Sequence, residues 1–232
     1  MKTPKLVVNN ATFFYEKSRS ESNGRYLSWE HCYKVFHDAR SASRVDYDLL
    51  SLHLAFYLAS WGMYRGSSFL LQKDYKVHTP VVKEILKPKY DCLFGVDCAK
   101  LREENIQNAL NELTHFLLNY YAAIRQESRE KKIENKVSDT LITKILMGTL
   151  GCVPAYDRFF IDGIKSQKVS TGTYNLKSLM KLVDFYEMNF ELFEKTRAGL
   201  FAYDIQYPQM KLLDMGFWQI GYEIDNNKKT QA

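Results

Sequence analysis

The sequence is poor in the residues that interrupt regular structure. Its 232 residues include only 5 prolines and 11 glycines, which argues against a loop-rich or all-β protein. The longest apolar stretch is interrupted by serine and histidine, and it is shorter than the ~20 residues that a membrane-spanning helix needs. The first residues lack the long apolar core of a signal peptide. We therefore expect a cytoplasmic protein with no membrane partner.

Recognisable metal and cofactor motifs are also missing. The four cysteines lie far apart except for Cys92 and Cys98, and no cysteine spacing matches a zinc site. None of the 5 histidines pairs with another at the spacing that places two ligands on one face of a helix. Phosphate-binding loops, nucleophile elbows and dinucleotide-binding glycine patterns are lacking. We expect no metal, no cofactor and structural thiols, in preference to a Cys92–Cys98 redox pair.

What the chain has in abundance is apolar and aromatic side chains in helical patterns. Hydrophobic residues make up 46% of the sequence and aromatic residues 14%, which is enough for one sizeable packed domain. Apolar residues at steps of three and four predict helices near residues 28–42, 99–130 and 174–195, and a last helix from about residue 208. The sequence predicts an all-α protein, a single compact domain of roughly eight to ten helices.

The most apolar helix is predicted at about residues 46–64. Apolar residues fall on nearly every face of this segment, which predicts a buried central helix around which the domain is built. The helical domain is assigned to residues 25–225. Residues 1–24 are expected to be an N-terminal arm or loop region that packs on the core or extends from it. Residues 226–232 are expected to be a frayed polar tail.

A first candidate site follows the central helix. Arg65 precedes the turn Gly66-Ser67-Ser68, in which the glycine suits the end of one helix and a serine can cap the next. Free backbone N–H groups at such a helix start, beside an arginine, can bind a phosphate or a carboxylate. The same pattern also fits an ordinary capped corner between two helices, which is the commoner use of such turns.

A second candidate site lies in residues 143–165, with the sequence TKILMGTLGCVPAYDRFFIDGIK. An apolar helix ends at a Gly-Cys pair, a Val-Pro turn follows, and Asp157 begins the next helix. This segment resembles the aspartate-bearing loop of helix-hairpin-helix DNA glycosylases. The resemblance implies that Asp157 serves the cleavage of a glycosidic bond. The glycine-rich hairpin of that family has no counterpart at residues 136–140, and Lys144 does not stand at the family's lyase position.

Physical chemistry gives the same segment two interpretations. A carboxylate at a helix N-terminus can stabilise positive charge that develops on a sugar. Aromatic side chains can stack on an extruded base, and Arg158 can contact a phosphate. The alternative is that Asp157 only caps its helix, as most aspartates at helix starts do.

Three classes of function remain. The formal charge of +5 permits an anionic partner without requiring one. The sequence favours a nucleic-acid-associated protein that binds DNA or RNA through a basic groove near Arg65 and Arg158. The first alternative is a glycosylase-like base-excision enzyme with Asp157 as its catalytic carboxylate. The second is a non-catalytic helical module that binds a protein partner or forms a homo-oligomer. It predicts that Arg65 and Asp157 are buried as caps and that an exposed apolar patch lies elsewhere.

Overall fold

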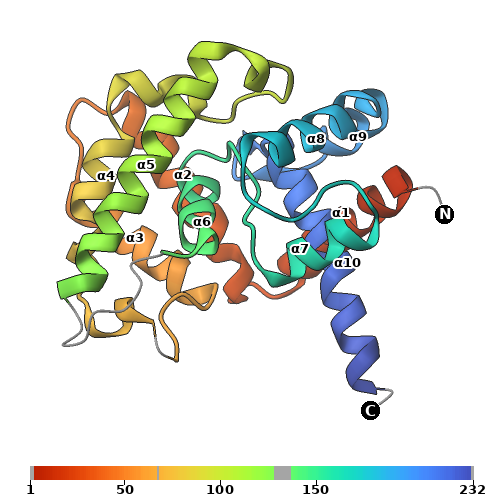
Figure 1. Cartoon of the computed structure of the whole chain (residues 1–232), viewed down its shortest axis with the longest axis horizontal. Coiled ribbons are helices and arrows are strands. Elements are labelled where there is room, and N and C mark those ends of the chain that lie inside the picture. The colour runs from red at the N-terminus through yellow and green to blue at the C-terminus, as the bar shows by residue number, and fades with distance from the viewer. Residues whose placement is uncertain (1–2, 67, 128–136, 231–232) are drawn as a thin grey trace.

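The computed structural model describes residues 3–66, 68–127 and 137–230, and it confirms the all-α prediction (Figure 1). The α-helices are α1 (Thr3–Ser20), α2 (Ser28–Ser41), α3 (Tyr47–Ser60), α4 (Thr79–Ile85), α5 (Glu104–Glu127), α6 (Asp139–Thr149), α7 (Arg158–Ser166), α8 (Leu176–Glu187), α9 (Phe190–Arg197) and α10 (Gln209–Thr230). Short 3-10 helices connect several of them. A small hairpin, β1 (Phe201–Ala202) with β2 (Ile205–Gln206), precedes α10.

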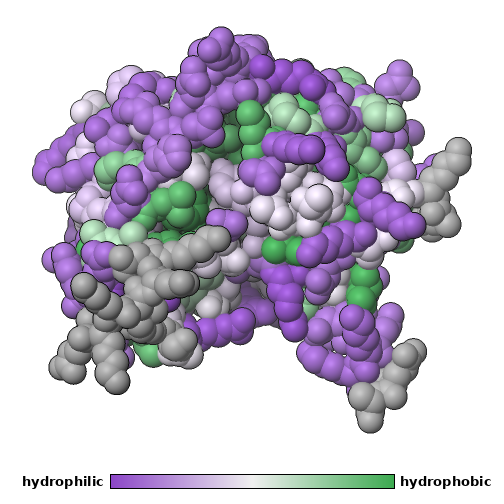
Figure 2. All heavy atoms as spheres, in the orientation of Figure 1, coloured by the Kyte–Doolittle hydropathy of each residue, from purple (hydrophilic) through white to green (hydrophobic). Residues whose placement is uncertain are grey.

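The helices form two groups with a shared core. Helices α3, α4 and α5 lie on one side of the molecule, and α1, α7, α8, α9 and α10 lie on the other, with α2 and α6 between them (Figure 1). The most extensive helix contacts are those of α10 with α7 and with α1. One cluster of buried apolar residues runs through both groups. On the face drawn in Figure 2, hydrophilic residues predominate and apolar residues emerge in small separate areas.

The apolar helix predicted at about residues 46–64 is present as α3, but the prediction of burial on all sides is wrong. Leu49, Leu52 and Phe56 are 46%, 48% and 54% exposed, so one face of α3 meets solvent. Burial on all sides belongs instead to α6, from Leu141 to its end, and to α10 from Gln209 to Gly221. The sequence concealed this because the buried part of α10 contains charged residues, whose partners lie inside the fold.

Helices α7 and α10 cross in direct backbone contact. A Cβ atom added to Gly163 of α7 would lie 1.9 Å from the carbonyl oxygen of Phe217. A Cβ atom added to Gly221 of α10 would lie 1.9 Å from the carbonyl oxygen of Phe159. Each helix therefore presents a glycine to the main chain of the other, and no side chain separates them at the crossing. This contact fixes the start of α7 against the middle of α10.

The two ends of the chain are more helical than the sequence indicated. Residues 3–20 form α1, which buries Val7, Ala11 and Phe14 and packs on α10. The prediction of a loop-like arm missed this helix because its polar residues hide the apolar stripe. The side chain of Asn10, for example, turns back and donates to the carbonyl of Leu6 at 2.9 Å. At the other end α10 continues to Thr230, so the expected frayed tail is helical over most of its length.

Most of the remaining helix boundaries follow the sequence, with two exceptions. The helix expected from residue 99 begins as α5 only at Glu104, after a separate 3-10 helix at Ala99–Arg102, and its expected end at residue 130 lies outside the described residues. The single helix expected at residues 174–195 is divided into α8 and α9 at Met188 and Asn189. The side chain of Asn189 donates to the carbonyl of Phe185 at 2.8 Å, which satisfies a helix end that would otherwise lack a partner. Within the described part of the chain, the search for a helix long and apolar enough to cross a membrane finds none.

Candidate functional site

A pocket of about 400 Å³ lies where α3 ends, α6 and α7 begin, and α10 passes beneath. It is lined by basic, aromatic and small residues: Arg25, Trp61, Gly62, Met63, Arg65, Thr140, Lys144, Asp157, Arg158, Phe159 and Trp218. Three residues that the sequence nominated separately, Arg65, Asp157 and Arg158, thus line the same pocket. They reach it from two loop regions that lie far apart in the sequence.

Gly66 and Ser68, which follow Arg65, are not among the residues that line this pocket. Gly66 has a φ of 60°, the left-handed conformation expected of a glycine there. Ser68 caps a short 3-10 helix (Phe69–Gln72) by accepting the N–H of Leu70 at 3.3 Å, and its hydroxyl donates to the carbonyl of Met63 at 2.6 Å. Ser67 lies outside the described residues. Gly66 and Ser68 therefore form a capped corner, and of the described residues in this predicted anion site Arg65 alone lines the pocket.

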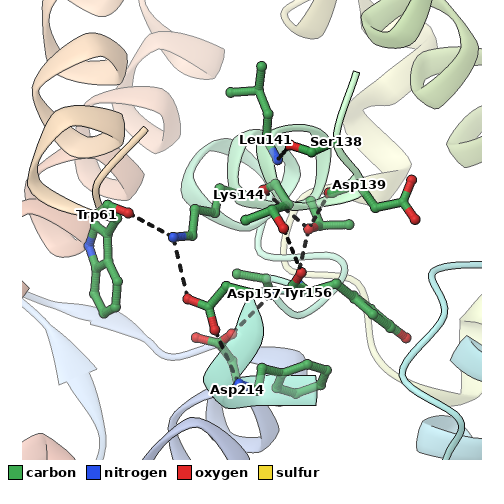
Figure 3. Close-up of polar contacts among 12 residues, drawn as sticks. Trp61, Ser138, Asp139, Leu141, Lys144, Tyr156, Asp157 and Asp214 are labelled. Carbon is green, nitrogen blue, oxygen red and sulfur yellow. Dashed lines mark hydrogen bonds and ion pairs between the residues drawn. The ribbon is translucent and has the colours of Figure 1, made fainter. Parts of the chain in front are cut away.

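Asp157 lies at the inner end of the pocket and holds two partners (Figure 3). As the N-cap of α7, it accepts the N–H of Phe160 through Oδ1 at 3.1 Å. Its Oδ2 lies 3.3 Å from Nζ of Lys144, and the side chains of Lys144 and Asp157 are only 5% and 13% exposed. Lys144 also donates to the carbonyl of Trp61 at 2.8 Å. Burial lowers the pKa of Lys144, and the carboxylate of Asp157 opposes that shift.

The loop that carries Asp157 into α7 is fixed by hydrogen bonds from two helices (Figure 3). From α6, Thr143 Oγ1 accepts the N–H of Tyr156 at 2.9 Å, and Thr140 Oγ1 donates to the carbonyl of Tyr156 at 2.9 Å. From α10, Asp214 Oδ1 accepts the N–H of Ala155 at 2.9 Å. Because the buried backbone of the loop is bonded on both sides, the loop is held in one conformation before any ligand arrives.

A second buried ion pair lies on α10, beside this loop. Nζ of Lys211 is 3.0 Å from Oδ2 of Asp214, and the two side chains are 3% and 7% exposed. The ammonium group lies 4.7 Å from the ring centroid of Trp29 and 5.7 Å from that of Trp61, within the range of cation–π attraction. Burial raises the pKa of Asp214, and Lys211 opposes that shift. Burying charges opposes folding, so packing alone does not account for this arrangement.

Aromatic rings form one wall of the pocket. Trp61 and Trp218 meet edge to face with centroids 5.9 Å apart, and Tyr26 lies 5.3 Å from Trp61 and 5.8 Å from Trp218. Phe159 meets Trp218 at 5.2 Å. The indole N–H groups of Trp61 and Trp218 are buried and have no acceptor within the described part of the chain. Ring contacts and nearby cations, and not hydrogen bonds of the indole N–H groups, therefore hold these two side chains.

Three arginines make the opening of the pocket basic. Arg25, Arg65 and Arg158 are all exposed. Arg158 lies over the ring of Phe159 at 4.6 Å and 3.3 Å from a carboxylate oxygen of Asp225. Among the described residues, Asp157 is the only carboxylate that lines the pocket, and Lys144 neutralises it. The lining therefore keeps an excess of positive charge, which attracts an anion.

Several residues of this site escaped the sequence analysis. Arg25, Trp61, Lys144 and Trp218 stand in four separate segments, and no local pattern connects them. In the sequence, Lys144 is one polar residue within an apolar helix, and Trp218 is one of many expected core residues. The local signals were the turn beside Arg65 and the helix-starting Asp157, and neither indicated the partners that the fold brings to it.

Comparison with known proteins identifies no relative, since no family model, curated protein or solved structure matches the chain. Over residues 3–66, 68–127 and 137–230, no group of three or more His, Cys, Asp or Glu side chains could hold a metal ion. The chemistry of the site has to be inferred from its own charges and shape.

A buried histidine anchors the segment that carries Arg65. Nε2 of His78 lies 2.6 Å from the hydroxyl of Tyr64, the residue beside Arg65, and Nδ1 lies 2.6 Å from the hydroxyl of Tyr121 on α5. Burial lowers the pKa of His78 to about 3. The ring is therefore neutral in the folded protein at ordinary pH, and it accepts from one phenol and donates to the other.

We expect this histidine to make the fold acid-sensitive. The unfolded chain takes up a proton on His78 near pH 6.5, whereas the folded chain does so only at about 3. Between these values acidification favours the unfolded state, by about 1.4 kcal/mol per pH unit at most. The protein should lose stability faster than a His78→Gln variant as the pH falls from about 6 to about 4. Urea denaturation across that range measures both slopes, and parallel slopes would contradict the assignment.

Proposed function

We propose that the protein binds nucleic acid and that the pocket receives one nucleotide unit. The arginines at the opening contact phosphate, and the aromatic wall contacts the base. The observation that carries this proposal is the convergence of Arg25, Arg65 and Arg158 on a pocket in which Asp157, the one carboxylate among its described lining residues, is already paired with Lys144.

The chemistry of the lining favours this ligand over other anions. Guanidinium groups match phosphate oxygens through pairs of parallel hydrogen bonds. Aromatic rings give a base a surface for stacking, and Trp61, Phe159 and Trp218 all line the pocket. A volume of about 400 Å³ falls within the range of small-molecule sites in proteins. A simple inorganic anion would leave the aromatic wall unused.

Replacing Arg65 tests the proposal most directly, because this arginine forms no ion pair with a carboxylate in the described residues. We expect Arg65→Ala to weaken binding of a short DNA duplex about tenfold at low salt. The salt dependence should fall by about one phosphate contact. Fluorescence anisotropy at two salt concentrations, with an intact and an abasic duplex, measures both effects.

The matched control is Arg44→Ala, since Arg44 is also exposed and does not line the pocket. It should bind as the unaltered protein does. Equal losses in the two variants would assign binding to general surface charge. No binding of either duplex or single-stranded DNA by the unaltered protein, even at low salt, would reject the proposal.

A base-excision enzyme is the second candidate, and the placement of Asp157 supports it. The carboxylate of Asp157 and the amine of Lys144 lie 3.3 Å apart in the lining of the pocket. A nucleotide bound there would place its sugar near a fixed negative charge, which can stabilise positive charge in the transition state of glycosidic cleavage.

Asp157→Asn separates this candidate from simple binding. Asparagine caps a helix about as well as aspartate, so we expect the fold and nucleic-acid affinity to persist. Any release of a base from duplexes that carry single damaged or mismatched bases should fall by about 100-fold or more. Alkali-induced strand cleavage reports the release. An unchanged rate in the variant would remove Asp157 from the chemistry.

The interaction-module alternative receives mixed support. Leu49, Leu52 and Phe56 form the exposed apolar patch that it predicted. It also predicted that Arg65 and Asp157 would be buried caps, and Arg65 is exposed at a pocket instead. We therefore rank this alternative below nucleic-acid binding.

A further inference from the structure

The aromatic wall does not end at the pocket. Tyr222, one turn after Trp218 on α10, stacks on it with centroids 5.1 Å apart and an interplanar angle of 9°. Tyr222 also meets Phe159 edge to face at 5.4 Å. Trp218 is 5% exposed, whereas Tyr222 is partly exposed. The stacked pair therefore leads from the wall of the pocket to the outer surface of α10.

A cation and a second ring lie beside Tyr222. Nζ of Lys17 lies 5.9 Å from the ring centroid of Tyr222 and 5.8 Å from that of Phe13. Phe13 and Lys17 are one turn apart on α1, and Phe13 is 49% exposed. No carboxylate forms an ion pair with Lys17 within the part of the chain that the structure describes. Phe13, Lys17 and Tyr222 form a surface that we call the outer track.

The outer track repeats an arrangement found in the pocket, namely a cation placed on an aromatic ring. Within the pocket, a cation lies on an aromatic ring at Arg158 and Phe159. Outside it, a cation again lies on an aromatic ring at Lys17 and Tyr222. A core contact would bury such rings, and an ordinary charged surface would not need them. Alternating cations and ring faces match a chain in which phosphates alternate with bases.

We infer that the outer track binds the stretch of single-stranded nucleic acid that continues from the nucleotide in the pocket. This inference rests on the proposed function of the pocket. The next base along the strand stacks on Tyr222 or Phe13, and the ammonium group of Lys17 turns from the rings to a phosphate. A duplex keeps its bases paired and stacked on one another, so it cannot offer a free base face to these rings.

The length of the bound strand tests this inference. Anisotropy is measured with labelled oligothymidylates of about two, four and eight nucleotides, and with a duplex of about eight base pairs. We expect affinity to rise with length for the single strands and to exceed that for the duplex. Tyr222→Ala should weaken binding of the longest strand about tenfold and leave the dinucleotide unaffected. Lys17→Ala should weaken the longest strand and lower its salt dependence.

Two control variants keep the result interpretable. Tyr222→Phe retains the stacking face and should bind as the unaltered protein does, which separates stacking from a damaged fold. Tyr203→Ala removes a tyrosine that is 56% exposed and lies outside the outer track, and it should have no effect.

The possible outcomes distinguish the outer track from the proposed function of the pocket. A length-dependent loss in Tyr222→Ala that Tyr222→Phe restores supports the track. Binding that is sensitive to Arg65→Ala, yet independent of strand length and of Tyr222, overturns the track and leaves the proposed function standing. Equal affinity for duplex and single strand, with Tyr222→Ala unaffected, also overturns the track. No binding of any strand by the unaltered protein overturns both proposals.

Discussion

Replacing Lys211 with methionine is expected to lower the free energy of unfolding by about 3 to 5 kcal/mol, the usual cost of removing one partner from a buried ion pair. Methionine has a similar length and is apolar, so the loss does not arise from packing. It arises because Asp214, whose side chain is 7% exposed, would remain buried without the ammonium group that lies 3.0 Å away.

The pH dependence of this loss follows from the same pair. Burial already raises the pKa of Asp214, and Lys211 opposes that shift. Without Lys211 the folded pKa of Asp214 should rise further above its unfolded value. A raised carboxyl pKa costs stability as the pH increases towards it, so the deficit of Lys211→Met should shrink on acidification. Denaturant unfolding at neutral and at mildly acidic pH measures both values.

A double variant provides the control. In Lys211→Met with Asp214→Asn, the buried charges are gone together, and the asparagine oxygen can still accept the N–H of Ala155 that Asp214 accepts at 2.9 Å. Replacing both members of a buried pair is often neutral or stabilising, so most of the loss should be recovered. A double variant as unstable as Lys211→Met would show that lost packing, not unpaired charge, causes the effect.

The second large effect is expected from Gly221→Ala. The added methyl group would lie 1.9 Å from the carbonyl oxygen of Phe159, and a backbone atom cannot move aside as a side chain can. Helices α7 and α10 must separate, so we expect a loss of about 3 kcal/mol or more in the free energy of unfolding. Gly163→Ala should have a similar effect, because its methyl group would meet the carbonyl of Phe217. Thermal and urea unfolding measure the losses.

Gly199→Ala is the matched comparison, since the nearest atom to its added Cβ is the carbonyl oxygen of Thr196 at 3.8 Å. That is an ordinary contact, so its melting temperature should stay close to that of the unaltered protein. If Gly221→Ala melted at the same temperature as Gly199→Ala, the close crossing of α7 and α10 would be refuted.

Much of the secondary structure could be predicted because its causes are local. The cap at Asp157, for example, is set by residues within one turn of α7, and it is confirmed. Which face of each helix is buried was harder to predict from the sequence. The apolar residues Leu49 and Leu52 are exposed, whereas the buried helix α10 contains a charged pair. Which charges are paired inside depends on neighbours that are distant in the sequence.

The site was predictable in part for the same reason. Arg65 was nominated for the turn that follows it, and Arg158 as a phosphate-binding cation beside Asp157. The structure places both in the lining of one pocket, but Gly66 and Ser68 of the turn do not line it. Arg25 and Trp218 had no local signal, because what unites them with Arg65 is the packing of α10 against the end of α3.

The glycine crossing of α7 and α10 makes one side of the pocket rigid. Asp157 and Arg158 start α7, Trp218 belongs to α10, and main-chain contact alone sets the spacing between these two helices. Substituting lining side chains leaves that spacing intact. The opposite side of the pocket is formed by the segment from Trp61 to Arg65, which follows the end of α3. Changes in ligand preference should therefore be obtainable by substituting Met63 or Arg65, while Asp157, Phe159 and Trp218 keep their relative positions.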